Sequence, residues 1–279
     1  MAARSGGRSA LARVVSVLEA FDADNPSLTV NHLARRSGLP VPTAHRIVGE
    51  MLKLGLLERG ADRKLRVGLR LWEMASVAPQ ARELREAAVP VMENLLTANQ
   101  QQTHLSVLEG SEALVIERLW GRNMVVNFTR AGGRHPLHAT TGGLVLLSHA
   151  DAELQNSFLS SKPRAYTRYT PTDPSRLRRI LAGVRDQGYV VCDGYLSLET
   201  VGIGVPVRSA TGEVIAALSV VLLRREARPM MHVPAVMTAA RNITRALVQG
   251  PARQRPPWFF PVAEIVAGAP GQPAARVQA

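Results

Sequence analysis

Residues 28–57, LTVNHLARRSGLPVPTAHRIVGEMLKLGLL, constrain the fold more than any other stretch, because they contain two short helical patterns separated by one break. In the first pattern Val30, Leu33 and Ala34 fall at i, i+3 and i+4, which predicts an amphipathic helix. Gly38 then predicts the end of this helix, because glycine readily takes the left-handed backbone conformation found at helix C-termini. The stretch therefore predicts a helix, a tight turn and a second helix.

The second helical pattern is the longer one, with apolar residues at i, i+3, i+4, i+7 and i+8. Its opposite face is polar and carries hydrogen-bond donors in the first turns. Two helices in this order are typical of a helix-turn-helix, whose second helix presents its N-terminal half to the DNA major groove. An ordinary pair of amphipathic helices in a larger bundle is the alternative. The apolar residues of the second pattern are Ala44, Ile47, Val48, Met51 and Leu52.

The flanking residues favour the DNA-binding interpretation. Ser9 is a suitable N-cap for a helix over residues 9–21. Residues 56–58 and 64–67 predict two short strands joined by a turn. Three helices closed by such a hairpin form a winged helix. We therefore expect a winged helix-turn-helix domain over residues 9–68.

Side chains on the exposed faces of this domain are candidates for contact with DNA. Arg46 is the best candidate for a base edge, because its guanidinium can pair bidentately with guanine. Cations on the hairpin suit the backbone phosphates. The expected DNA-binding residues are Arg35, Pro42, Thr43, His45, Arg46, Arg63 and Lys64.

The net charge supports a nucleic-acid partner. The chain has 34 Lys and Arg against 22 Asp and Glu, a formal net charge of +12. A basic surface attracts a phosphate backbone and so fits double-stranded DNA. General arginine richness is the alternative explanation, because the rest of the chain is also basic.

The remainder of the chain predicts a second domain. A short amphipathic helix around Leu71 and Trp72 begins a linking region over residues 69–86. Residues 87–249 then alternate short strands with helices, which is typical of an α+β domain with one mainly antiparallel sheet. The expected strands are residues 103–108, 113–120, 124–129, 189–193, 201–207 and 214–222.

Proline, glycine and cap residues predict where other segments begin and end. Asp173 is the cap of a clear helix, and Gly188 is its stop. Pro90 predicts a kink or a break in a helix over residues 80–99. Residues 1–8 are expected to form a disordered arm, and residues 250–279, with six prolines, a mostly disordered tail.

Cysteine use and hydropathy predict a cytoplasmic protein. Cys192 is the only cysteine, so no intramolecular disulfide can form. The first residues lack the apolar run of a secretory signal. No stretch approaches the roughly 20 apolar residues that span a bilayer, so we expect no membrane association.

Several separate segments together resemble the IclR family of bacterial transcriptional regulators. They include RVVSVLEAF, LARRSGLPVPTAHRIVGEMLKLGLLER, HPLHATTGG, DQGYVVCDG and VPVRSATGEVIAALSV, in this order, and the resemblance covers residues 10–248. It implies a winged helix-turn-helix, a linking helix and a C-terminal effector-binding domain similar to a GAF domain. It further implies dimers that often pair into tetramers, palindromic operators, and small carboxylates or aromatic acids as effectors.

The resemblance also implies a ligand pocket in the second domain. Thr141 and Gly142 match positions whose backbone amides face the ligand at a helix start, where amides and the helix dipole favour an anion. Ser219 matches a pocket hydroxyl, and Leu144 stands where a lysine is common in the family. A protonated His135 would add attraction for an anion. The other matching positions, at which polarity is redistributed relative to the family, are Asn127, His135, Cys192, Gly202 and Val221.

Other functions have weaker support in the residues. His135 and His138 are spaced as metal ligands can be, but no cysteine or carboxylate pair accompanies them. No Ser-His-Asp order stands out, so we expect neither catalysis nor a cofactor. Cys192 is either a redox sensor or, as is commoner for a lone cysteine, a small buried residue. A purely architectural DNA-binding protein is a further alternative, against which the size of the second domain argues.

Overall fold

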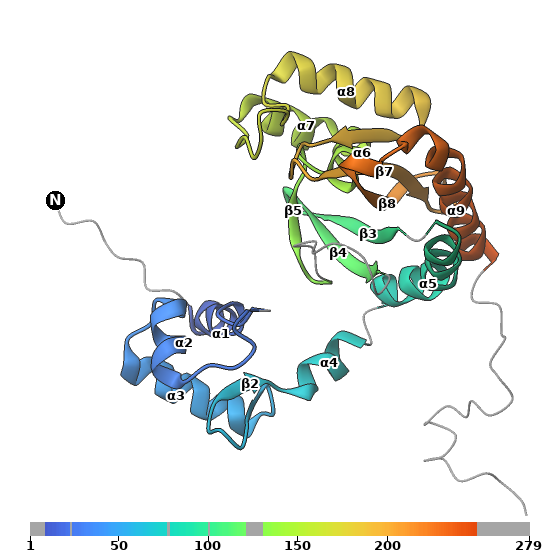
Figure 1. Cartoon of the computed structure of the whole chain (residues 1–279). Coiled ribbons are helices and arrows are strands. Elements are labelled where there is room, and N and C mark those ends of the chain that lie inside the picture. Colours follow the sequence, from blue (N-terminus) through green and yellow to red (C-terminus); the bar gives the residue numbers. More distant parts are fainter. Residues whose placement is uncertain (1–8, 23, 77–78, 100, 121–130, 250–279) are drawn as a thin grey trace, which may run out of the picture. The chain divides into compact units, whose positions relative to one another are not determined.

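The computed structural model describes residues 9–22, 24–76, 79–99, 101–120 and 131–249 (Figure 1). The chain divides into two compact units, with the boundary after Arg82. Three expectations lie outside the described residues: the N-terminal arm, the strand at residues 124–129 and the C-terminal tail.

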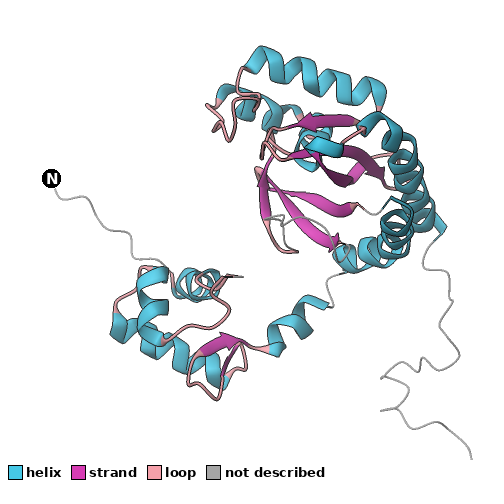
Figure 2. Cartoon of the chain, viewed as in Figure 1, coloured by secondary structure: helices cyan, strands magenta, loops and turns pink. Residues whose placement is uncertain are grey.

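The first unit is a winged helix, as predicted. Three helices are followed by an antiparallel two-stranded hairpin and a further helix (Figure 2). Leu28 adds one bridge to the hairpin through backbone hydrogen bonds with Leu65. The elements are α1 (Ala10–Glu19), α2 (Val30–Ser37), α3 (Val41–Lys53), β1 (Leu57–Arg59), β2 (Leu65–Val67) and α4 (Leu69–Ser76).

The ends of the first two helices follow from the local sequence. The Ser9 side chain accepts a hydrogen bond from the backbone N–H of Ala12 at 3.1 Å and so caps α1. Gly38 ends α2 with a φ of 67°, the left-handed conformation expected of it. In contrast, α3 begins after Pro40 without a side-chain cap.

The core of the first unit lies between the three helices and the hairpin. The apolar stripes of α2 and α3 contribute Leu33, Ile47, Val48 and Met51 to its buried residues, as their spacing predicts. Val17 is the buried residue of α1, whereas its apolar residues Leu11 and Val15 are exposed. The apolar residues of α1 therefore pack only partly into this core.

The second unit contains one antiparallel sheet, which confirms the predicted α+β class (Figure 2). The strand order is β5-β4-β3-β8-β7-β6, and each pair of neighbours is antiparallel. The strands are β3 (Gln102–Glu109), β4 (Glu112–Leu119), β5 (Arg134–Pro136), β6 (Val190–Asp193), β7 (Thr200–Arg208) and β8 (Val214–Leu223).

Helices cover both faces of this sheet (Figure 1). They are α5 (Pro79–Asn99), α6 (Thr141–His149), α7 (Ala152–Ser160), α8 (Pro174–Gln187) and α9 (Pro229–Gln249). On one face, α5 and α9 pack against a cluster that includes Leu105, Ile203 and Leu218. On the other face, α6 contacts β3, β7 and β8, and α8 packs on α6. Because side chains alternate along a strand, the residues next to Leu105, Ile203 and Leu218 face α6.

Of the kink or break expected at Pro90, the break does not occur: α5 continues through the proline, and Leu84 and Leu95 pack against the sheet on either side of it. The helix α7 is one that the sequence pattern did not indicate. Its N-cap is Asp151, whose side chain accepts a hydrogen bond from the backbone N–H of Leu154 at 2.7 Å.

The helix α8 has the ends that its sequence predicts. The Asp173 side chain accepts a hydrogen bond from the backbone N–H of Arg176 at 2.9 Å. Pro174 occupies the first helical position, where its missing N–H costs nothing. Gly188 ends the helix with a φ of 76°. Both ends are therefore determined locally.

Candidate functional site

The exposed face of α3 carries most of the residues predicted to contact DNA. The apolar stripe of α3 is buried in the core of the first unit, so the opposite face points to solvent. Pro42, His45 and Arg46 are exposed on that face, and Thr43 is half-buried. Among the described residues no ion pair holds Arg46, so its guanidinium can reach a partner.

Two neighbouring arginines of α2 differ in their surroundings. The Arg36 side chain donates to the carbonyl oxygen of Ala20 at 2.7 Å and pairs with Asp22, so it ties α2 to the loop after α1. Arg35 is exposed. This difference supports Arg35, rather than Arg36, as a candidate for contact with DNA.

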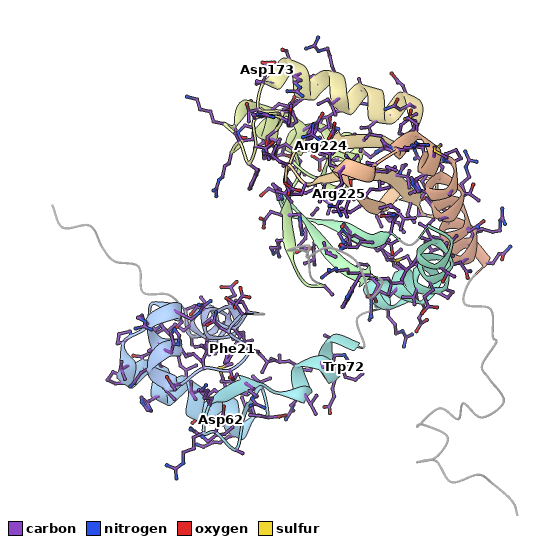
Figure 3. All side chains as sticks on the ribbon, viewed as in Figure 1. Phe21, Asp62, Trp72, Asp173, Arg224 and Arg225 are labelled. Carbon is purple, nitrogen blue, oxygen red and sulfur yellow. The ribbon has the colours of Figure 1, made fainter. Side chains whose placement is uncertain are left out.

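The hairpin between β1 and β2 presents further cations. Asp62, labelled in Figure 3, accepts a hydrogen bond from the backbone N–H of Lys64 at 3.2 Å and pairs with Arg66 at 3.7 Å. The Arg59 side chain donates to the carbonyl oxygen of Arg63 at 3.0 Å. These contacts order the turn and leave Arg63 and Lys64 exposed.

The second unit contains a cavity of about 800 Å³ between the sheet and the beginning of α6. Ligand pockets typically measure roughly 300–1,000 Å³, so this volume suits a small organic molecule. Asn127, one of the predicted effector-binding residues, lies outside the described residues. The other predicted residues all line the cavity: His135, Thr141, Gly142, Cys192, Gly202, Ser219 and Val221.

Glycines in β7 let the first turn of α6 approach the sheet closely. A Cβ atom at Gly202 would lie 2.8 Å from Cγ2 of Thr141, and one at Gly204 would lie 2.7 Å from its Cβ. Only glycine allows such an approach in a strand. The Oγ1 of Thr141 donates to Oγ of Ser219 at 3.0 Å, which fixes this turn over β8. The start of α6 thereby forms part of the cavity wall.

The start of α6 also offers two backbone amides to the cavity. Thr140 caps the helix by accepting a hydrogen bond from the backbone N–H of Gly143 at 3.1 Å. An α-helix leaves its first N–H groups without intrahelical acceptors. Those of Thr141 and Gly142 have no acceptor among the described residues. Because these amides carry partial positive charge, this end of the cavity favours an anion.

Two histidines in the cavity wall are neutral at pH 7. Burial lowers the pKa of His104 to about 3, and the nearby His135 and Arg118 add to this effect. Burial also lowers the pKa of His135, with Glu112 opposing the change. Desolvation thus disfavours the charged ring, on which the expected attraction between a protonated His135 and an anion depends.

Part of the cavity wall was not evident from the sequence. His104 and Ser106 line it from β3, and their alternation with Leu105 is a signal that could have placed both on one face. The rim includes a loop around Thr167 and a turn at Tyr195, which have no periodic pattern. The Thr167 Oγ1 donates to the Gly194 carbonyl oxygen at 2.5 Å and so joins loop and turn.

The surroundings of His138 and Cys192 favour structural roles for both residues. The Nε2 of His138 lies 2.8 Å from the Arg164 carbonyl oxygen, and its ring packs near Phe158 and Tyr166. In the part of the chain that the structure describes, no group of three potential metal ligands occurs. Burial raises the pKa of the Cys192 thiol, so little reactive thiolate forms. This favours the small buried residue over the redox sensor.

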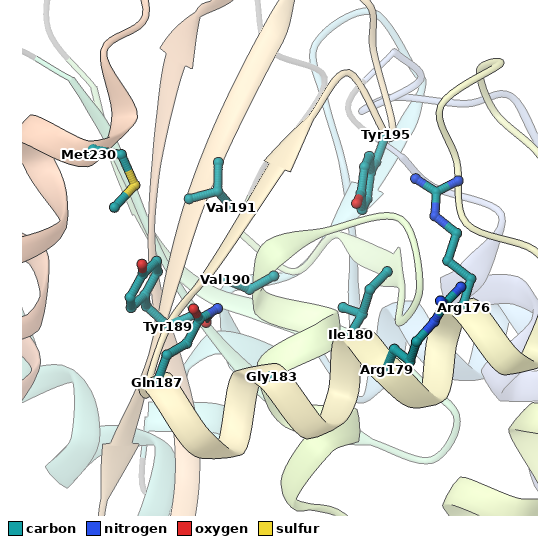
Figure 4. A pocket seen from close by; sticks show the side chains of 10 residues that line it. All are labelled: Arg176, Arg179, Ile180, Gly183, Gln187, Tyr189, Val190, Val191, Tyr195 and Met230. Atoms are coloured by element: carbon teal, nitrogen blue, oxygen red, sulfur yellow. Dashed lines mark hydrogen bonds between the residues drawn. The ribbon is translucent and has the colours of Figure 1, made fainter.

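A second hollow, of about 510 Å³, lies between α8 and β6 (Figure 4). Arg176 and Arg179 flank one end of it, and Tyr189 and Met230 lie at the other end. Both arginines are exposed. Among its described lining residues, no buried side-chain polar atom lacks a hydrogen-bond partner, so this hollow has a weaker case for a specific ligand than the cavity under α6.

Comparisons with known proteins agree with this architecture. The model of the IclR helix-turn-helix domain matches residues 10–61, and that of the bacterial transcriptional regulator IclR C-terminal domain matches residues 77–245. A crystal structure of an IclR homolog from Microbacterium hydrocarbonoxydans, complexed with 4-hydroxybenzoate, is 43% identical with a TM-score of 0.83. The match covers 87% of this chain and 100% of that one.

Two relatives of known name are similar over most of their length. The HTH-type transcriptional regulator XynR of Escherichia coli (strain K12) is 31% identical over 212 residues, which are 74% of this chain and 83% of the relative. The p-hydroxybenzoate hydroxylase transcriptional activator of Acinetobacter baylyi is 29% identical over 244 residues, which are 85% and 89% of the two chains.

A winged helix and an α+β domain with a ligand-sized cavity, joined in one chain, define a DNA-binding transcriptional regulator with an effector domain. The chain belongs to the IclR family of bacterial transcriptional regulators. This membership confirms that the protein is a regulator and not an enzyme. Among the described residues, no helix has the length and apolar character needed to cross a membrane.

Proposed function

We propose that this protein binds a palindromic operator and that a small aromatic carboxylate in the cavity changes its affinity for that operator. The proposal rests on the backbone amides at the start of α6. The amides of Thr141 and Gly142 supply the partial positive charge that a carboxylate needs. The described lining residues include no lysine or arginine, so these amides are the main anion-binding groups of the cavity.

The aromatic character of the effector rests on the cavity wall and on the relatives. Val115, Leu196 and Val221 provide apolar surface for a carbon skeleton. A homolog that is 43% identical is complexed with 4-hydroxybenzoate, and another relative is named the p-hydroxybenzoate hydroxylase transcriptional activator. These relatives support 4-hydroxybenzoate as the first compound to test on this chain.

The DNA interface of the proposal is the exposed face of α3 together with the hairpin. Arg46 is placed toward a base edge, and Arg35, Arg63 and Lys64 are placed toward phosphates. A two-fold symmetric dimer would place one such helix on each half of a palindrome. The half-sites should then lie about one helical turn, or a multiple of it, apart.

A titration of DNA-bound protein tests the effector site. The probe is a fluorescent duplex selected from random DNA by the purified protein, and the acids are benzoate and 4-hydroxybenzoate. We expect at least one acid to change the apparent Kd of the wild type for this duplex. Gly142→Val should bind the duplex like the wild type and lose the response, because its Cβ would lie 3.3 Å from Ser106 Oγ and crowd the anion-binding end.

The variants are compared with the wild type at the acid concentration at which the wild type responds. A Gly142→Val variant that responds there as the wild type does would contradict the placement of the carboxylate. Gly183→Ala is the matched control, because a Cβ at Gly183 of α8 meets no atom within 4 Å. It should keep both DNA binding and the response.

A further inference from the structure

The hollow between α8 and β6 lies along the open edge of the sheet in the second unit (Figure 4). β6 is the last strand in the order of this sheet, and no described strand pairs with its outer side. Val190 and Val191 both line the hollow, although side chains of successive strand residues point to opposite faces. The hollow therefore follows the edge itself, where an extended segment can pair with the backbone of β6.

The two ends of the hollow differ in polarity. Arg176 and Arg179 flank one end, where the Arg176 guanidinium lies 5.8 Å from the ring centre of Tyr195. At the other end Tyr189 and Met230 offer apolar surface, and Met230 is 60% exposed. No aspartate or glutamate is among the described lining residues. A segment that fits this hollow therefore carries apolar side chains at one end and an acid at the other.

The chain after α9 contains such a segment. Residues 250–279 lie outside the described residues and beyond residue 245, at which the match to the family's C-terminal domain ends. Within them, residues 258–266 read WFFPVAEIV, and Glu264 is the only acidic residue of the whole stretch. Aromatic and β-branched residues favour an extended chain, and Pro261 is compatible with the outermost strand of a sheet. We call residues 258–266 the tail segment.

The path of α9 decides which end of the hollow the tail segment reaches first. The helix begins at the hollow with Met230, and a Cβ at Gly188 would lie 3.7 Å from Cε of Met237. Because Gly188 directly precedes Tyr189, α9 leaves the hollow past its apolar end. From Met237 to Gln249 the helix rises about 18 Å. The residues between α9 and the tail segment can span about 26 Å in the extended state, so the tail segment can return to the apolar end.

The length and charge of the tail segment match those of the hollow. When Trp258 lies at the apolar end, Glu264 follows about 20 Å further along an extended chain. On α8, Gln187 and Arg176 are about 17 Å apart along the helix axis. The side chains of Glu264 and Arg176 can bridge the difference. The only acid of the tail segment thus comes beside the two arginines, whereas the reverse direction would place Trp258 there.

We propose that the tail segment docks as an extended strand in the hollow between α8 and β6 of its own chain, with Trp258 at Met230 and Glu264 at Arg176 and Arg179. The segment is tethered to the domain, so its effective concentration is on the order of millimolar and weak contacts are sufficient. The docked segment covers a sheet edge that would otherwise be open to pairing with another chain. This inference does not depend on the identity of the effector.

Hydrogen–deuterium exchange of the full chain and of a chain that ends at Gln249 tests the docking. Amides of β6 that point away from β7 should exchange at least tenfold more slowly in the full chain, because only the docked segment can pair with them. Glu264→Arg should lose most of this protection. Adding Arg176→Glu and Arg179→Glu to that variant should restore part of it, because the charges are then exchanged between the two sides.

A matched control separates the hollow from the general charge of α8. Arg178 is exposed on α8 but does not line the hollow, so Arg178→Glu should leave the protection of β6 unchanged. Equal exchange of β6 in the full and the shortened chain would overturn the proposal. Protection that persists in the shortened chain and grows with protein concentration would assign the edge to a second copy, and would overturn it as well.

Cross-linking distinguishes the chain's own tail segment from that of another copy. Trp258 is replaced by the photoreactive residue benzoylphenylalanine, which attaches to neighbouring C–H groups on irradiation. We expect a cross-link to Met230 or Tyr189 in a product that migrates as a single chain on a denaturing gel. A product with the mass of two chains, or cross-links only to residues outside the hollow, would contradict docking within one chain.

Discussion

Single residues on α3 and on the hairpin are expected to contribute differently to DNA binding. Arg46→Ala should weaken binding to a selected duplex by about 1–3 kcal/mol and relax specificity at one position. Lys64→Ala should weaken binding to all duplexes alike and reduce its salt dependence, because it removes a phosphate contact. Fluorescence anisotropy over a range of salt concentrations measures both effects. Unchanged affinity of Arg46→Ala at fixed salt would mean that another face of α3 contacts DNA.

The neutral state of His104 is expected to make the stability of the second unit depend on pH. Its pKa is about 3 in the folded protein, below the ordinary value of 6.5, so the unfolded chain is protonated first as the pH falls. The stabilisation is therefore complete above pH 6.5 and is lost progressively toward pH 3. At pH 5 the loss should be about 2 kcal/mol.

Urea denaturation at pH 7.5 and pH 5 measures this loss. The difference in free energy of unfolding between the two pH values should be smaller for His104→Gln than for the wild type. If this difference were equal for His104→Gln and the wild type, protonation of other histidines would cause the loss of stability. His135, His138 and His149 are the candidates, because burial lowers the pKa of each.

At the scale of elements, the contact between α6 and β7 holds the cavity wall in place. Gly204→Ala should destabilise the protein by about 1–3 kcal/mol, because its Cβ would lie 2.7 Å from Cβ of Thr141 and 2.9 Å from its carbonyl carbon. Gly183→Ala in α8 should instead stabilise it by up to about 1 kcal/mol, because alanine favours a helix and the site is open. Calorimetry of both variants would contradict the packing argument if their melting temperatures shifted in the same direction.

At the scale of the whole molecule, exposed apolar side chains of the first unit support self-association. Leu11 is 78% exposed, Leu69 is 69% exposed and Trp72 is 70% exposed. We expect a symmetric dimer, because two-fold interfaces are the commonest in soluble oligomers. Light scattering should give the mass of a dimer or a tetramer, and a monomer at micromolar concentration would rule the dimer out. Trp72→Ser should weaken the assembly, whereas Ile215→Ser, on the sheet of the second unit, should leave it unchanged.

Local sequence was sufficient for several helix ends and for the hairpin of the first unit. Cap and stop residues act on backbone groups only a few residues away, so their effects can be predicted without knowing the tertiary contacts. These residues are Ser9, Gly38, Asp173 and Gly188. Periodic apolar stripes likewise predicted the buried faces of α2 and α3. The family resemblance predicted the cavity residues of α6, β7 and β8, because those positions lie in or near the segments that match the family.

Which side chains meet across the sheet was decided only by the tertiary structure. β3 pairs with β8, far away in the sequence, and this pairing brings His104 next to Ser219 and Thr141. No local pattern encodes which strands become neighbours. Nor does it encode the burial that keeps His104 and His135 neutral, because desolvation depends on segments that come together only in the folded chain. The cavity residues at the start of α6 were therefore predictable from the resemblance, whereas the part of the cavity wall formed by β3 and the charge of the histidines required the fold.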